Sequence, residues 1–235
     1  MNIQEPFKNL IQSRQACTTC HHDDNLCHFE KLLTDGKDSN LYSPWNPCEK
    51  NTLDAEILIV GQDFGIFQYL KEAGNTQGLI NKERDNSTNK KLLKYLKSAD
   101  LVDKSIYFTN AILCIKNGKS KNTKSGTSMS SKVEPEWFEN CSSRFLRPLI
   151  TEHLNNLKVI ITLGKYALYS INHIVGHETT EPIIRLVAKP QHISISNKSY
   201  VLIPMLHPSF DHLSIKGHEK FTKATESWEY LKSIV

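Results

Sequence analysis

Three short polar segments of the sequence contain side chains that could do chemistry together. They supply the carboxylate of Asp63, the amide of Asn110 and the imidazole of His207, each at the end of an apolar run. A carboxylate can orient water, an amide offers both a donor and an acceptor, and an imidazole can donate a proton or a hydrogen bond. If the apolar runs are parallel strands, their carboxyl ends share the edge of the sheet where ligands bind. The three groups are therefore predicted to face a common site.

Each segment also has a structural interpretation that involves no ligand. An acid after a strand, such as Asp63, often caps the next helix. Asparagine after a strand is a common turn former, and the His-Pro-Ser sequence at 207–209 makes a rigid corner. The convergence of all three favours a functional site, because separate turns would not be expected to bring an acid, an amide and an imidazole to one edge.

Apolar runs alternate with helical patterns along most of the chain. The strand-like runs are residues 57–60, 106–111, 159–164, 192–196 and 200–206, and the helical patterns are residues 88–99, 135–155, 165–174 and 218–235. This alternation is typical of βαβ units. We therefore predict a single α/β domain over residues 1–235, with a central, mostly parallel four-stranded sheet flanked by helices. Pro148 is expected to end or bend the second helix.

The composition is that of a globular protein in an aqueous compartment. Hydrophobic residues make up 39% of the chain and charged residues 23%, as in ordinary folded domains. No apolar run approaches the roughly 20 residues of a membrane span, and the N-terminus lacks the apolar core of a signal peptide. We expect a cytoplasmic monomer with no membrane partner. The net charge of +4 is too small to demand a nucleic-acid partner by itself.

Two segments depart from the α/β pattern. Residues 1–50 are predicted to form a cysteine-rich N-terminal appendage on the sheet. Residues 115–133 are predicted to form a lysine-rich insertion loop, with five lysines and no acid. A loop of this length without secondary structure is usually functional or disordered, although a merely solvated loop is an alternative.

The six cysteines favour metal binding, catalysis or buried thiols over disulfides, because a cytoplasmic chain keeps its thiols reduced. Cys17 and Cys20 form a C-x-x-C pair, the spacing that lets two thiolates bind one metal or cluster. A zinc site is one possibility. The side chains that could join it are Cys17, Cys20, His21, His22, Cys27, His28 and Cys48.

The order of short motifs along the chain resembles that of the uracil-DNA glycosylase superfamily. These motifs are GQD at 61–63, TN followed by LC at 109–114, LGKYAL at 163–168 and HPS at 207–209. The resemblance implies hydrolysis of the N-glycosidic bond of uracil, or of a related deaminated base, in single- or double-stranded DNA. The base would be flipped into a pocket at the carboxyl ends of the strands.

The same resemblance assigns roles to the groups at the strand ends. Asp63 would position water and stabilise the sugar cation, His207 would stabilise the leaving base through a hydrogen bond, and Asn110 would read the edge of the base. The other substrate-binding residues that it implies are Gly61, Gln62, Phe64 and Ser209.

The layout is closest to the iron-sulfur branch of this family. That likeness implies a [4Fe–4S] cluster with zinc as the alternative, and its ligands would be Cys17, Cys20, Cys114 and Cys141. The cluster would have a structural role, fixing the base of the lysine-rich loop. The loop would then direct Lys119, Lys121 and Lys124 at DNA phosphates.

The sequence departs from the best-known branch of the family at two places. Gly65 stands where that branch has a tyrosine that excludes thymine, and residues 70–94 contain no aromatic side chain that could stack on the base. Phe64 or Phe67 would have to supply the stacking. The departures leave open an inactive protein of the same fold that binds DNA or a protein partner. A redox or metal-sensing protein is a third possibility, but the strand-end loops lack the glycine motifs of nucleotide-binding sites.

Overall fold

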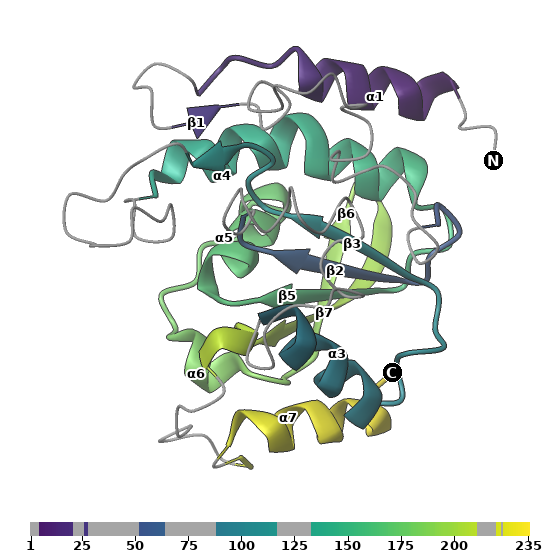
Figure 1. Ribbon diagram of the computed structural model, residues 1–235, viewed down its shortest axis with the longest axis vertical. Coiled ribbons are helices and arrows are strands. Elements are labelled where there is room, and N and C mark those ends of the chain that lie inside the picture. Colours follow the sequence, from purple (N-terminus) through teal and green to yellow (C-terminus); the bar gives the residue numbers. More distant parts are fainter. Residues whose placement is uncertain are drawn as a thin grey trace.

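A five-stranded sheet occupies the centre of the computed structural model, in the order β3–β2–β5–β7–β6 (Figure 1). Its strands are β2 (Ile57–Gly61), β3 (Ile106–Asn110), β5 (Val159–Leu163), β6 (Gln191–Ile195) and β7 (Lys198–Met205). The strands β3, β2, β5 and β7 pair in parallel, which confirms the predicted mostly parallel α/β sheet. The structure describes residues 5–20, 26–27, 52–63, 88–116, 133–210, 220–221 and 223–235.

The sheet has five strands rather than the four predicted, because the run at 192–196 joins it as an edge strand. This strand, β6, pairs antiparallel with β7. The connecting residues Ser196 and Asn197 have φ values of 48° and 65°, as in a two-residue hairpin turn. Residues of β6 alternate between half-buried and exposed up to its last residue, as expected for a strand covered on one face only.

The apolar side chains of β2 alternate between two covered faces of the sheet. Leu58 and Val60 point into one hydrophobic cluster, whereas Ile57 and Ile59 point into a second cluster on the opposite face. All four are at most 2% exposed. The two-residue period of a strand produces this alternation, and cover on both faces explains why the run is continuously apolar.

Helices from distant parts of the chain cover the two faces (Figure 1). Those on the first face are α1 (Glu5–Gln15), α4 (Pro135–Cys141) and α5 (Lys165–Val175), and their buried residues share a cluster with Leu58. Those on the second face are α3 (Thr88–Ser98) and α7 (Ala224–Tyr230). Between α3 and α7 the rings of Tyr95 and Trp228 stack with centroids 5.4 Å apart.

The helix predicted to end or bend at Pro148 does not end there. After α4 the chain continues through two π-helical segments, η4 (Ser142–Leu146) and η5 (Leu149–His153). The N–H of Arg147 donates to the carbonyl of Ser142, and the N–H of Leu154 donates to that of Leu149 at 3.0 Å. This wider i to i−5 pattern shifts the hydrogen bonds around a proline that has no N–H to contribute, so the helix extends beyond Pro148.

The remaining described elements are short. The strand β1 (Leu26–Cys27) pairs antiparallel with β4 (Ile115–Lys116), so the N-terminal segment meets the start of the lysine-rich insertion. The predicted C-terminal helix is described as α7 followed by the 3-10 turn η7 (Leu231–Ser233), and the short helix α6 (Ile183–Leu186) was not predicted.

Most of the predicted appendage and insertion, residues 28–50 and 117–132, lies outside the described residues. Their assignment as separate segments therefore stays a prediction. None of the described helices is long and apolar enough to cross a membrane.

Candidate functional site

The carboxyl ends of the parallel strands lie at one edge of the sheet and carry the three polar groups singled out in the sequence. Asn110 is the last residue of β3, Asp63 follows β2 by two residues, and His207 follows β7 by two residues. The strands β3 and β7 are separated by β2 and β5, so their axes are about 14 Å apart. Asn110 and His207 therefore stand on opposite sides of Asp63 along this edge.

Gly61 and Asn110 are packed tightly against each other. They are paired in register across β2 and β3, and a Cβ atom added to Gly61 would lie 2.5 Å from Oδ1 of Asn110. Backbone pairing continues past the strands, where the N–H of Ala111 donates to the carbonyl of Gly61 at 2.8 Å. Glycine at position 61 thus provides the space that the amide of Asn110 occupies.

His207 is held by η6 (Pro208–Phe210), the turn that follows β7. The backbone N–H of Ser209 donates to Nδ1 of His207 at 3.3 Å, and Oγ of Ser209 lies 2.7 Å from the same nitrogen. A ring nitrogen that accepts from a backbone N–H carries no proton, so the neutral imidazole has its proton on Nε2. The group that His207 can offer to a ligand is therefore the Nε2–H donor.

The surroundings of His207 favour this neutral form. Burial lowers the pKa of His207 below its ordinary value of 6.5, and the carboxylate of Asp63 partly opposes the shift. The opposing effect means that Asp63 and His207 are close enough to influence each other electrostatically. The edge thus combines an acid with an imidazole that stays uncharged at neutral pH.

Gly164, which lies between β5 and α5, packs against His207. Its φ is 90°, a conformation that residues with a side chain rarely adopt, and an added Cβ would lie 3.3 Å from Cβ of His207. Its N–H donates to the carbonyl of Met205 at 2.8 Å. A glycine at this point allows α5 to begin directly beside the end of β7.

Two predicted substrate-binding residues contact the candidate catalytic groups. Nε2 of Gln62 donates to Oδ2 of Asp63 at 2.9 Å, and Ser209 holds His207 as described above. These contacts orient the carboxylate and the imidazole. Four further predicted residues lie outside the described part of the chain, namely Phe64 and the DNA-binding candidates Lys119, Lys121 and Lys124.

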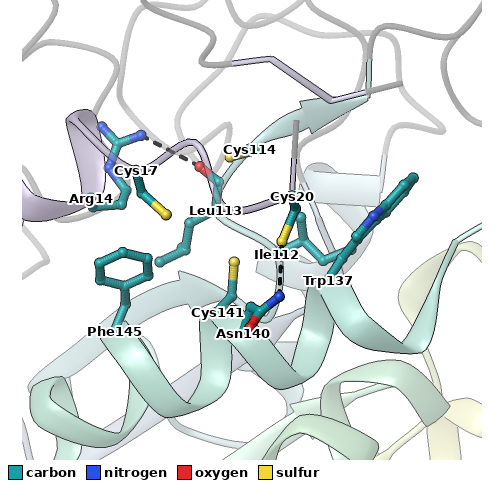
Figure 2. Close-up of a pocket in the computed structure, with 10 residues that line it drawn as sticks. All are labelled: Arg14, Cys17, Cys20, Ile112, Leu113, Cys114, Trp137, Asn140, Cys141 and Phe145. Carbon is teal, nitrogen blue, oxygen red and sulfur yellow. Dashed lines mark hydrogen bonds between the residues drawn. The ribbon is translucent and has the colours of Figure 1, made fainter. Parts of the chain in front are cut away.

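Four cysteines from distant parts of the chain line a second cavity, on the face of the sheet that α1 and α4 cover (Figure 2). Cys17 and Cys20 follow α1, Cys114 follows β3, and Cys141 ends α4. All four are free thiols, and Figure 2 shows them around a common space. The remaining lining residues are Arg14, Ile112, Leu113, Trp137, Asn140 and Phe145. The structure therefore brings together the four cysteines that were predicted as a ligand set.

The cavity disfavours unbound thiolates. Burial is the main reason that the pKa of Cys141 rises to about 12, and it also raises the pKa of Cys114 and Cys20. Mutual repulsion among the cysteines acts in the same direction, because each thiolate disfavours the next. A bound cationic centre would reverse this balance, since metals bind the deprotonated form.

The described thiols do not form the arrangement of a single-ion site. A tetrahedral zinc with Zn–S bonds of about 2.3 Å needs sulfurs about 3.8 Å apart. Within the part of the chain that the structure describes, no group of three or more His, Cys, Asp or Glu side chains could hold one metal ion. Four thiols around a shared, mostly apolar space fit the ligand set of a [4Fe–4S] cluster. The side chains of the other candidate zinc ligands, such as Cys27 and Cys48, lie outside the described residues.

The family model of the uracil DNA glycosylase superfamily matches residues 49–232 of the chain. The chain belongs to the uracil DNA glycosylase superfamily. This match spans all four strand ends of the candidate site and confirms the resemblance seen in the motif order. It begins after Cys17 and Cys20, so it does not extend to the C-x-x-C pair. No curated protein matches the chain. Membership indicates a glycosylase-type function on DNA.

Two residues beside the candidate sites, Phe210 and Arg14, were not identified from sequence. Phe210 is 48% exposed and its ring meets that of His207 edge-on at 6.3 Å, which becomes visible only once η6 is in place. The sequence does contain a sign that Arg14 is unusual, because this arginine shares the buried face of α1 with Phe7 and Ile11. These three positions have the i, i+4, i+7 spacing of one helix face, where an arginine is out of place unless it has a partner.

Gly61→Ala is expected to lower the free energy of unfolding by about 1 kcal/mol, because the new methyl group must displace the amide of Asn110. Urea unfolding measures this cost. In an Asn110→Ala background the same change should cost less, since the oxygen that the methyl group meets is gone. An equal cost in both backgrounds would contradict the packing described here.

The free energy of unfolding is expected to fall as the pH drops below about 6.5, partly because of His207. Burial lowers the pKa of His207 in the folded state. As the pH falls, the unfolded chain therefore takes up this proton at a higher pH than the folded protein does, and protonation favours unfolding. Urea unfolding between about pH 5 and pH 8 measures this slope. His207→Gln should have a shallower slope, while the contribution of His153, whose pKa burial also lowers, remains. An unchanged slope would show that His207 is not protected from protonation.

Proposed function

We propose that the protein removes uracil, or a related deaminated base, from DNA by hydrolysing the N-glycosidic bond. The observation that carries this proposal is that Asp63 lies within electrostatic reach of a neutral His207 at the strand edge that also carries Asn110. Such a site supplies a negative charge for one end of the scissile bond and hydrogen-bond donors for the other. We further propose that it acts as a monomer in the cytoplasm.

The bond to be broken joins a sugar carbon to a ring nitrogen of the base. As it lengthens, positive charge develops on the sugar and negative charge on the departing base. The carboxylate of Asp63 would stabilise the sugar cation and orient a water molecule for attack. Gln62, which donates to Oδ2 of Asp63, would keep the carboxylate in this position.

The leaving base would be stabilised and recognised by two side chains. Nε2–H of His207 would donate to the oxygen on which negative charge collects, and a neutral donor suits this task without supplying a full proton. The amide of Asn110, which lies against Gly61, would pair its donor and acceptor with the polar edge of the base. Phe64 would stack on the flipped ring, and backbone N–H groups near Gly61 and Ser209 would hold the flanking phosphates.

The surface next to this edge suits DNA. α3 packs against η6 and carries Lys90, Lys94 and Lys97 at the i, i+4, i+7 spacing of one helix face. Phe210, the exposed ring beside His207, offers a surface for stacking on an unpaired base. The lysine-rich insertion would add Lys119, Lys121 and Lys124 to these phosphate contacts.

An inactive DNA-binding or protein-binding role is the second candidate. It is favoured by Gly65 in place of the tyrosine of the best-known branch and by the absence of aromatic residues from 70 to 94. The two candidates differ in turnover, so a single assay separates them.

The assay uses single- and double-stranded oligonucleotides with one uracil, followed by alkali to break the strand at any abasic site. Wild type is expected to yield breaks, and Asp63→Asn or His207→Gln to lower the rate by about 100- to 10,000-fold, as for catalytic acid-base groups. Asp103→Asn is the matched control. This exposed acid lies in the turn before β3, at the opposite end of that strand from the candidate site. A guanine–thymine mismatch tests whether Gly65 admits thymine.

Wild type that leaves every oligonucleotide intact, yet binds DNA in a salt-dependent way, would overturn the glycosylase proposal in favour of the binding role. Breaks that persist at full rate in Asp63→Asn would instead remove Asp63 from the mechanism.

For the cysteine cavity we propose a [4Fe–4S] cluster, with zinc as the alternative. The residues that would hold it are Cys17, Cys20, Cys114 and Cys141. When bound, the group would act as a structural cross-link rather than as a redox centre. Cys17 and Cys20 would be tied to the segment after β3 and to α4, which fixes both sides of the lysine-rich insertion.

Protein purified without oxygen is expected to be brown and to contain iron and sulfide in equal amounts. Cys114→Ser and Cys141→Ser should lose most of both, because each removes one of four ligands. Cys27→Ser and Cys48→Ser are the matched controls and should retain them. Colourless protein that contains zinc and loses it in the Cys27 or Cys48 variants would favour the zinc alternative.

A further inference from the structure

Arg14 is a buried charge next to the cysteine cavity. It is 1% exposed, although arginine side chains are rarely buried without compensation. Its Nη1 donates to the backbone carbonyl of Leu113 at 3.4 Å, the residue before Cys114. Figure 2 shows its guanidinium beside Cys17 and this carbonyl, at the rim of the space that the thiols share. A guanidinium is a cation with five N–H donors and no acceptor.

Asn140 makes a second polar contact in the same cavity. Its Nδ2 donates to Sγ of Cys20 at 3.3 Å, and it stands one residue before Cys141 on α4. A hydrogen bond from an amide is stronger when the sulfur is a thiolate than when it is a thiol. Arg14 and Asn140 come from two different helices, so their meeting in this cavity is a feature of the tertiary fold.

The positive charge of Arg14 could balance negative charge on the cysteines of the cavity. The other ionisable side chains among the described lining residues are the four cysteines. Four thiolates around a [4Fe–4S] core, whose own charge is smaller than theirs, would leave a net negative centre in an apolar pocket. Taking that negative charge out of water is costly unless a positive charge or hydrogen-bond donors lie close to it.

We infer that Arg14 is the built-in counter-charge of a four-thiolate metal centre and that Asn140 orients its Cys20 ligand through an N–H···S hydrogen bond. This inference rests on the metal centre put forward under the proposed function. Both are positioning residues, because they act on the ligands and do not bind the metal. The inference also gives α1 a role in metal retention, since its buried face carries Arg14 to the cavity.

The experiment compares wild type with Arg14→Met, Arg14→Lys and Asn140→Leu, all purified without oxygen. Arg14→Met keeps much of the buried aliphatic stem and removes the charge, whereas Arg14→Lys keeps a charge of different shape. Arg147→Met is the matched control, because Arg147 also donates to a backbone carbonyl, that of Ile174, but does not line the cavity. Circular dichroism checks that each variant is folded.

The readouts are iron and sulfide content, the rate at which the visible absorbance is lost to a chelator, and the reduction potential. Arg14→Met and Asn140→Leu should lose the metal about 10- to 100-fold faster than wild type, as do other changes to residues that support ligands. Arg14→Lys should be intermediate and Arg147→Met unchanged. Removing the positive charge should also lower the reduction potential, because the reduced cluster is the more negative form.

The outcomes separate this inference from the proposed cofactor. Wild type with a cluster whose retention and potential are the same in Arg14→Met and Asn140→Leu would overturn the inference alone. Wild type without iron and sulfide would overturn the cluster and, with it, this inference.

Discussion

The hydrogen bonding of β2 to a parallel neighbour on each side is the constraint on which the rest of the structure depends. β2 pairs with β3 and with β5, and β5 pairs in turn with β7, so four strand ends are forced to one edge. The pairing persists beyond the end of β2, since the N–H of Ile112 donates to the carbonyl of Gln62 at 2.9 Å. Backbone hydrogen bonds between the strands thus place the polar residues at this edge, independently of contacts between their side chains.

Much of this arrangement could be predicted because it follows from short-range patterns. Branched apolar runs identify buried strands, and their alternation with helices leaves few topologies other than a parallel sheet. Asp63, Asn110 and His207 could be placed at a common edge for the same reason. The four cysteines were grouped through family resemblance, since their separation along the chain carries no geometric signal of its own.

Other features could not be predicted because they depend on tertiary contacts. The π-helical path through Pro148 reflects the packing of a long helix against the sheet, which outweighs the local tendency of proline to end it. The role of Gly164 becomes clear only when Cβ of His207 lies beside it. The turn that closes the hairpin of β6 and β7 uses Ser196 and Asn197 rather than a glycine, so the edge strand was seen as a run but not counted in the sheet.

The segment from Asn110 to Cys114 links the strand edge with the cysteine cavity. The three residues between them, Ala111, Ile112 and Leu113, are at most 1% exposed. The segment is therefore packed in the core, and neither of its ends can move independently. One short buried segment therefore holds the amide of Asn110 and the sulfur of Cys114 at a fixed separation. A substitution that moves one end would also move the other, which couples the shape of the strand edge to that of the cysteine cavity.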